Sequence, residues 1–195
     1  GKTLFLSQMA VTFYTTFNTL LLGYFYNPTV VGQYVAADKM RMAAQSLLNP
    51  IQQVIFPRIN KEQDSIANKI KKYRLVILLP SLIMAIISIF MGQKIALLYL
   101  GHSYLEASNL FVLMMCLLPI ISFSVIYGQW GLIVIGKEKA MTKIYFFAAA
   151  AHAIYSVPLV IKYSTFGMVT SVMLTESMVS IFMFYVFNKY QRSGQ

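Results

Sequence analysis

Long apolar runs, separated by short polar stretches, dominate the pattern of this chain. Residues 75–91 and 110–135, for example, contain no Lys, Arg, Asp or Glu. A helix that crosses a membrane needs about 17–25 mostly apolar residues, and backbone groups in hydrocarbon must find their hydrogen bonds inside the same segment. The pattern therefore predicts an all-α, polytopic membrane protein. Its six predicted transmembrane helices cover residues 4–26, 33–56, 75–91, 108–135, 143–161 and 166–187.

Turn-forming residues separate these predicted spans. They are Asn27 and Pro28, Gly101, Gly136, and residues 164–167. The connections leave no room for a soluble module, so we expect a single transmembrane domain over residues 1–195. Since the sequence begins at Gly1 without an initiator Met, we also expect a fragment of a longer chain.

Charged residues are few and unevenly distributed. They make up 11% of the chain, against about 25% in soluble domains, and the net charge is +10. Most Lys and Arg residues fall at both ends and in alternate connections, whereas the opposite connections carry only Lys94 and Lys162. This bias predicts that both ends lie in the cytoplasm. Because the basic residues lie between apolar spans, we do not expect a nucleic-acid partner.

Two polar stretches flank the third predicted span. Residues 58–74 mix both signs of charge, which predicts either a helix on the cytoplasmic surface, held by anionic membrane lipids, or a solvated loop. Residues 92–99 are amphipathic and bounded by glycines. We expect a short interfacial helix there.

The sequence lacks the residue patterns that carry common enzyme chemistry. Cys116 is the single cysteine, and His102 and His152 are the two histidines. There is no metal-spaced Cys/His cluster, no Gly-rich phosphate loop and no HExxH motif. We therefore expect no metal, no cofactor and no enzyme activity.

The second predicted span carries three charged residues, Asp38, Lys39 and Arg41. Charges at membrane depth are costly and are functional candidates by default. Arg41 lies roughly 12 Å below the outer end of the span, where a water-filled cavity would solvate it. Alternatively, Asp38 and Arg41 neutralise each other at i, i+3. On one straight helix, a continuous polar stripe would comprise Asp38, Arg41, Gln45, Asn49 and Gln52.

Two titratable residues lie in the middle of later spans. Glu176, near the centre of the sixth, either binds and releases a proton or serves as a counter-ion to a cation. His152, in the fifth, is a second candidate proton carrier, or a hydrogen-bonded packing residue. Both readings stay open for each residue.

The spans also carry neutral polar stripes and prolines. In the first span, a stripe with Asn18 beside it either lines the same cavity or packs against a neighbouring helix. The stripe consists of Gln8, Thr12, Thr15 and Thr19. Prolines within or near the ends of spans predict kinks. They are Pro50, Pro119 and Pro158.

Several motifs resemble the O-antigen and polysaccharide flippases (Wzx-like). Residues 31–40 read VGQYVAADKM, Asn49 and Pro50 follow, and residues 55–59 read IFPRI. In that family a vGxYxxAxK opening and an fPxi close bracket the first helical hairpin of the C-terminal half. The matching positions are Gly32, Tyr34, Ala37, Lys39, Phe56 and Pro57. The resemblance continues in residues 101–107, GHSYLEA, and at Gly128, Leu132 and Gly136.

The resemblance implies a transporter of the MOP superfamily, which includes the MATE exporters and has twelve or more helices around a central cavity. This chain would be its C-terminal half, without the N-terminal half. The implied function is translocation of an undecaprenyl-pyrophosphate-linked oligosaccharide across the bacterial inner membrane for surface polysaccharide synthesis, coupled to an H⁺ or Na⁺ gradient.

The resemblance also suggests roles for particular residues. Lys39 and Arg41 would hold the anionic headgroup of the substrate. The other cavity-lining candidates are Gln45, Asn49 and Asn18. The candidates for ion coupling are Glu176, Asp38 and His152.

Three other functions compete with this one. A MATE-like exporter of cations would favour an acidic cavity, which Lys39 and Arg41 argue against. A membrane-embedded O-antigen polymerase would need a large outer loop, whereas the outer connections here are short. A passive channel or structural bundle would leave the charges within the spans unexplained.

Overall fold

The computed structural model describes residues 2–61 and 64–193, and this part of the chain forms helices with short connections and no strands. Its α-helices are α1 (Lys2–Phe25), α2 (Pro28–Ser46), α3 (Asn49–Lys61), α4 (Ile66–Leu100), α5 (Leu105–Met115), α6 (Leu117–Ser124) and α7 (Glu138–Ser193). A 3-10 turn, η1 (His102–Tyr104), precedes α5, and a π-helical segment, η2 (Val125–Ile133), follows α6. The prediction of an all-α protein is confirmed.

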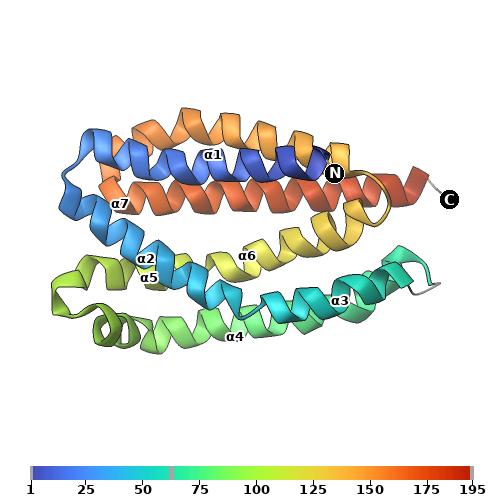
Figure 1. Ribbon diagram of the computed structural model, residues 1–195, viewed down its shortest axis with the longest axis horizontal. Coiled ribbons are helices and arrows are strands. Elements are labelled where there is room, and N and C mark those ends of the chain that lie inside the picture. Colours follow the sequence, from blue (N-terminus) through green and yellow to red (C-terminus); the bar gives the residue numbers. More distant parts are fainter. Residues whose placement is uncertain (1, 62–63, 194–195) are drawn as a thin grey trace.

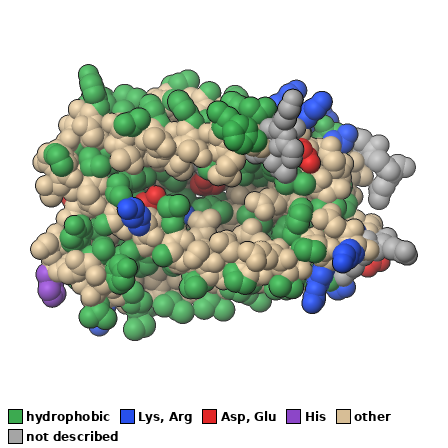
Figure 2. All heavy atoms as spheres, viewed as in Figure 1, with side chains coloured by type: hydrophobic (Ala, Val, Ile, Leu, Met, Phe, Trp, Pro, Cys, Tyr) green, Lys and Arg blue, Asp and Glu red, His purple; other side chains and the backbone are tan. Residues whose placement is uncertain are grey.

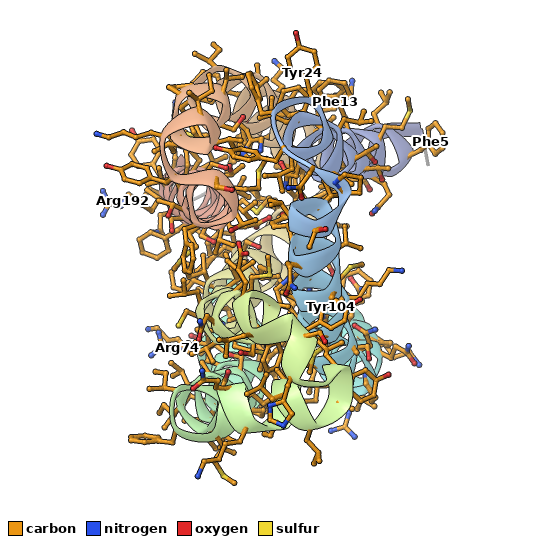
Figure 3. The ribbon with its side chains drawn as sticks, turned by 90° about the vertical axis from the view of Figure 1, so that its left-hand side faces the viewer. Phe5, Phe13, Tyr24, Arg74, Tyr104 and Arg192 are labelled. Atoms are coloured by element: carbon orange, nitrogen blue, oxygen red, sulfur yellow. The ribbon has the colours of Figure 1, made fainter. Side chains whose placement is uncertain are left out.

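The helices form an elongated bundle with two outer layers (Figure 1). In one layer α1 packs against α7, and in the other α3 packs along α4. Between them, α5, α6 and η2 contact both α4 and α7. Helix α2 crosses from one layer to the other along one side of the bundle, as the end-on view in Figure 3 also shows.

Helix α7 consists of two arms joined by a sharp turn. Ser164 has φ 52° and ψ −131°, outside the helical range. Figure 1 shows the chain reversing there, with an orange arm leading in and a red arm leading back. The turn predicted at residues 164–167 is therefore confirmed.

The described part of the chain contains three stretches that are long and apolar enough to cross a membrane. They are Ile66–Leu100, His102–Ile133 and Glu138–Arg192, the last of which includes both arms of α7. Large apolar side chains also cover the outside of the bundle (Figure 2). The chain is thus a multi-pass membrane protein, whereas the individual boundaries of the six predicted spans stay predictions.

Proline residues explain two breaks in the helices. Pro50 has no N–H group to bond the carbonyl of Ser46, and the chain turns at residues 47–48, between α2 and α3. Pro119 likewise has no N–H group for the carbonyl of Met115, where α5 ends. The kinks expected at these two prolines are confirmed. Pro158, by contrast, lies inside the continuous first arm of α7.

Helix α4 is longer than the predicted third span, with 35 residues. The separate interfacial helix predicted over residues 92–99 is wrong, because these residues continue α4. Gly92 lies within the helix and allows α5 to approach closely, since a Cβ there would meet Val112 Cγ2 at 3.0 Å. Gly92 was therefore not the end of a helix, as its position in the sequence suggested, but a site of close packing between α4 and α5.

The described residues between 58 and 74 belong mostly to the ends of two longer helices and form no helix of their own. Residues 58–61 end α3 and residues 66–74 begin α4, while residues 62–63 lie outside the described part. The buried Lys69 donates a hydrogen bond to Ile59 O at 2.7 Å. This bond joins the two helices across their connection.

We predict that Gly167→Ala destabilises the turn in α7. A Cβ at Gly167 would lie 2.0 Å from Leu159 O, a backbone atom that cannot move without shifting the helix. Overpacking of this kind costs about 1–3 kcal/mol. The thermal midpoint of the full-length protein in detergent, measured by fluorescence-detected size-exclusion chromatography, should fall.

Gly23→Ala is the matched control for this variant. A Cβ at Gly23 meets Val31 Cγ2 at 3.9 Å, which is an ordinary contact. Its thermal midpoint should stay at the wild-type value or rise. Equal midpoints for the two variants would contradict the tight turn.

Candidate functional site

A buried polar network joins three helices inside the apolar bundle. His152, on the first arm of α7, is fully buried. Its Nε2 lies 2.7 Å from Asn18 Oδ1 on α1, and its Nδ1 lies 2.6 Å from Thr175 Oγ1 on the second arm of α7. The Asn18 amide nitrogen donates in turn to the Tyr34 hydroxyl on α2, at 3.3 Å. The network therefore links α1, α2 and both arms of α7.

The hydrogen-bond pattern determines where His152 carries its protons. Asn18 Oδ1 can only accept, so His152 Nε2 donates to it. Thr175 has one hydroxyl proton and lies within reach of His152 Nδ1 and of Ser171 O, the latter at 2.8 Å. It donates to Nδ1 when the ring is neutral, and to Ser171 O when Nδ1 is protonated. Rotation of one hydroxyl thus accommodates both protonation states.

Glu176 lies beside this network. It follows Thr175 in the sequence, and its side chain is 9% exposed. The Tyr155 hydroxyl lies 2.5 Å from Thr175 Oγ1 and extends the network. The structure therefore brings two of the three ion-coupling candidates, His152 and Glu176, into one region of the bundle.

Arg41 on α2 forms an ion pair with Asp38, at 2.8 Å. Its Nε and Nη2 face Asp38 Oδ1, and its Nη1 donates to Gln45 Oε1 at 2.5 Å. A guanidinium has five N–H groups, so two of those on Arg41 have no partner among the described residues.

The polar stripe predicted along the second span is shorter than expected. Hydrogen bonds connect Asp38, Arg41 and Gln45. The break at residues 47–48 then changes the direction of the helix, so Asn49 starts α3 in a different orientation. The cavity-lining role of Asn49 stays a prediction.

Lys39 and Arg41 lie on different faces of α2. Lys39 is exposed and lines a groove between α2 and α4, whereas Arg41 bonds to its neighbours along α2. At about 100° per residue, two positions along a helix separate side chains by about 200°. The two cations that were expected to hold one headgroup together are therefore set apart.

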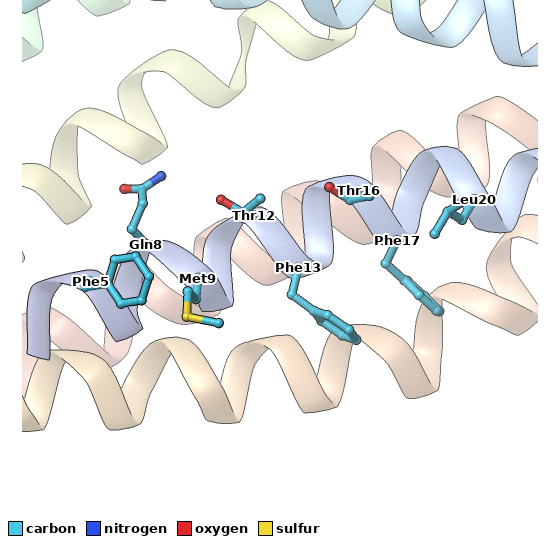
Figure 4. Close-up of a pocket in the computed structure, with 8 residues that line it drawn as sticks. All are labelled: Phe5, Gln8, Met9, Thr12, Phe13, Thr16, Phe17 and Leu20. Carbon is cyan, nitrogen blue, oxygen red and sulfur yellow. The ribbon is translucent and has the colours of Figure 1, made fainter. Parts of the chain in front are cut away.

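Only part of the neutral stripe predicted on α1 lines a groove. Gln8 and Thr12, together with Thr16, which was not in the predicted stripe, line a shallow groove of about 460 Å³ along the helix, whereas Thr15 and Thr19 do not. Figure 4 shows Gln8, Thr12 and Thr16 on one side of α1 and Phe13 and Phe17, which also line the groove, pointing to the other. Asn18 is 2% exposed and faces the interior, so it contributes to the His152 network and not to this groove.

Sequence reasoning identified most members of the buried network but not their connections. Tyr34 was singled out by the family motif alone, and Thr175 immediately precedes Glu176 in the sequence. One signal in the sequence could have predicted these connections. Asn18, His152 and Thr175 each lie far from the ends of their apolar segments. Polar groups at similar depths in a membrane are expected to find one another.

We predict that Asn18→Ala lowers the stability of the bundle. The substitution leaves the Nε2–H group of His152 buried without an acceptor, which costs about 1–3 kcal/mol. The thermal midpoint of the full-length protein in detergent should fall. Thr12→Ala, at an exposed position of the same helix, should leave it unchanged, and equal losses in both variants would refute the role of the network.

Comparisons with known proteins agree with the resemblance found in the sequence. The family described as "Polysaccharide biosynthesis protein" matches residues 1–63. Two relatives carry the name "Putative O-antigen transporter". One, from Shigella dysenteriae, is 41% identical over 181 residues, which are 92% of this chain and 46% of the relative. The other, from Escherichia coli strain K12, is 29% identical over 193 residues, 94% of this chain and 45% of the relative.

No solved structure matches the chain. The chain spans about half the length of the curated relatives it matches. These matches confirm the resemblance, and the chain belongs to the O-antigen and polysaccharide flippase family.

Proposed function

We propose that the chain is part of a transporter that moves an O-antigen precursor across the inner membrane of a bacterium. Two relatives are named for O-antigen transport, and both match more than nine-tenths of this chain. Since the chain spans about half of each relative, we propose that a preceding N-terminal half completes the transport pathway. The substrate proposed is an undecaprenyl-pyrophosphate-linked oligosaccharide, which the protein moves without a chemical reaction.

The observation that carries this proposal is the arrangement around Arg41. An ion pair at membrane depth is costly unless it serves a packing or binding role. Asp38 balances the charge of Arg41, yet two N–H groups of the guanidinium have no partner among the described residues. Guanidinium groups bind phosphate through two parallel hydrogen bonds. We assign Arg41 to the pyrophosphate, and Gln45 and Asn49 to hydroxyl groups of the sugars.

The remaining candidates are assigned either to ion coupling or to positioning of His152. His152 and Glu176 are the proposed proton sites, since one hydroxyl rotation lets the network around His152 accept either protonation state. Asn18 would then hold His152 in place and not contact the sugar. Asp38 would couple through Arg41, because protonation of Asp38 would release the guanidinium from its partner. A Na⁺ gradient is the alternative driving force.

The orientation proposed for the chain follows from its charges. Both ends and the basic connections would lie in the cytoplasm. The turn at Ser164 and the connection at Gly101 would then face the periplasm, at the end of the bundle opposite the basic residues. The membrane lipids around the bundle would contact the apolar side chains on its outside.

We predict that Arg41→Ala in the full-length protein causes lipid-linked oligosaccharide to accumulate on the cytoplasmic face of the membrane. The loss of hydrogen bonds to a charged ligand should lower transport about tenfold or more. The measurement is the amount of lipid-linked oligosaccharide in each leaflet, with expression and membrane insertion verified. The double variant Asp38→Asn, Arg41→Gln, which leaves no unpaired charge, should show the same defect.

Lys94→Ala provides the control for a lost positive charge outside the site, since Lys94 is exposed on α4. It should leave the distribution between leaflets unchanged. Normal surface polysaccharide in cells with Arg41→Ala would mean that the ion pair has a structural role and that the proposed substrate contact is wrong.

We predict that Glu176→Gln removes the pH dependence of transport. The amide keeps the shape of the carboxyl group but cannot take up a proton. The initial rate of transport by the reconstituted full-length protein should no longer respond to an imposed pH gradient. Glu106→Gln, at the Thr165 contact near one end of the bundle, should respond like the wild type, and an unchanged response in Glu176→Gln would exclude this residue from coupling.

A further inference from the structure

The hydrogen bonds that lead from His152 to Tyr34 all run in one direction. His152 Nε2 donates to Asn18 Oδ1 at 2.7 Å, and the Asn18 amide nitrogen donates to the Tyr34 hydroxyl oxygen at 3.3 Å. A hydroxyl that accepts a hydrogen bond keeps its own proton for a further acceptor. Tyr34 is buried, and its hydroxyl donates to no described residue. This row of donors therefore ends in an unused O–H group.

An unused acceptor lies one turn further along α2. Tyr34 and Asp38 are four positions apart, which places their side chains next to each other on one face of the helix. Arg41 Nε and Nη2 each lie 2.8 Å from the same carboxylate oxygen of Asp38, Oδ1. The other oxygen, Oδ2, has no hydrogen-bond partner among the described residues. A donor without an acceptor and an acceptor without a donor are thus neighbours on α2.

This face of α2 joins the two parts of the candidate site. Positions 34, 38, 41 and 45 fall within about 60° of one another around the helix axis. The ion pair of Arg41 with Asp38 lies on this face, and Arg41 also donates to Gln45. The buried network reaches the same face through Tyr34. Tyr34 therefore connects the buried histidine with the helix that carries Arg41.

We propose that Tyr34 is a positioning residue that transmits the protonation state of His152 to the ion pair of Arg41 with Asp38. When Arg41 turns from Asp38 toward an anionic ligand, the Tyr34 hydroxyl donates to Asp38 Oδ2 and takes the place of the guanidinium. The inference rests on the proposed function and deepens it, because it names the residue through which the proton site regulates the substrate site.

A positive charge on His152 favours this exchange. A second proton on the ring binds at Nδ1, where the Thr175 hydroxyl turns to Ser171 O. The Nε2–H group of the charged ring then forms a charge-assisted hydrogen bond, and such bonds are about twice as strong as neutral ones. In a row of hydrogen bonds that run in one direction, each bond polarises the next. The Tyr34 hydroxyl becomes a stronger donor to Asp38, so the protonated protein binds the anion more tightly.

The titratable groups beside this row belong to α2 and to both arms of α7. On α2 they are Asp38 and Arg41, and on α7 they are Tyr155 and Glu176. Helix α1 supplies the neutral amide of the row, and α5 contributes apolar side chains to the cluster that includes Tyr34. A substitution that removes only the Tyr34 hydroxyl leaves all four titratable groups in place.

The experiment measures binding of undecaprenyl pyrophosphate to the purified full-length protein in detergent, by microscale thermophoresis between about pH 5 and about pH 8. In the wild-type background, His152→Gln should remove a tightening of about tenfold at acidic pH, a usual size for coupling between two sites. In the Tyr34→Phe background, the same substitution should change the pH response by about twofold or less, because the row is already broken. Titration of the ligand is common to all variants and cancels in this comparison.

Two further backgrounds complete the test. Tyr26→Phe is the matched control, because it removes a tyrosine hydroxyl that donates to Val160 O at 2.9 Å, outside the row. There His152→Gln should keep its full effect. Asp38→Asn removes the charge of the acceptor instead of the donor, and it should abolish the effect of His152→Gln as Tyr34→Phe does. It carries the test if the thermal midpoint shows that Tyr34→Phe does not fold.

Two results would overturn the inference. An equal effect of His152→Gln in the wild-type, Tyr34→Phe and Asp38→Asn backgrounds would mean that the charge of the histidine acts on the ligand through space. A pH response that His152→Gln leaves unchanged in the wild-type background would mean that the buried histidine does not regulate binding.

The same variants separate this inference from the proposed function. If Arg41→Ala cells accumulate lipid-linked oligosaccharide but Tyr34→Phe keeps the full effect of His152→Gln, the role of Tyr34 fails and the transport proposal stands. If Tyr34→Phe abolishes that effect while Arg41→Ala cells make normal surface polysaccharide, the role of Tyr34 stands and the transport proposal fails.

Discussion

Polar groups inside a membrane must satisfy one another, because hydrocarbon offers them neither hydrogen bonds nor solvation. In this bundle the constraint is met largely between α1 and the first arm of α7. Three hydrogen bonds join Ser7 to Thr142, Asn18 to His152, and Tyr26 to Val160, at 2.8, 2.7 and 2.9 Å. The separation in sequence is 135, 134 and 134 residues. Because this offset is almost constant, the two helices run parallel and are held together along their full length.

The position of α2 depends on the same constraint. Gln33 accepts a hydrogen bond from Ala107 N and donates one to Ser103 O, both at 2.9 Å, and so links α2 to the start of α5. Tyr34 links it to α1 through Asn18. These contacts to α5 and α1 fix the rotation of α2 about its own axis. Because of this rotation, Arg41 and Lys39 face different surfaces.

The sequence predicts the helices well, because apolar runs and turn residues are local signals. The breaks after Ser46 and Met115 could also be predicted, since each follows from a proline four residues later. The length of α4 could not, because Gly92 resembles a boundary until the packing of α5 is known. The link between Asn18 and His152 was beyond sequence reasoning for the same reason. It depends on which helices are neighbours, and hydropathy does not carry that information.

The two cations on α2 are accommodated in different ways, because the rotation of the helix turns them toward different surfaces. Arg41 is paired with Asp38 and donates a hydrogen bond to Gln45 on the same helix, which limits the cost of holding its charge among apolar helices. Lys39 is exposed beside the groove between α2 and α4, where its long apolar stem can lie along apolar side chains while its ammonium group reaches water. Each cation on α2 is thus stabilised by a different mechanism, although the two residues are only two positions apart in the sequence.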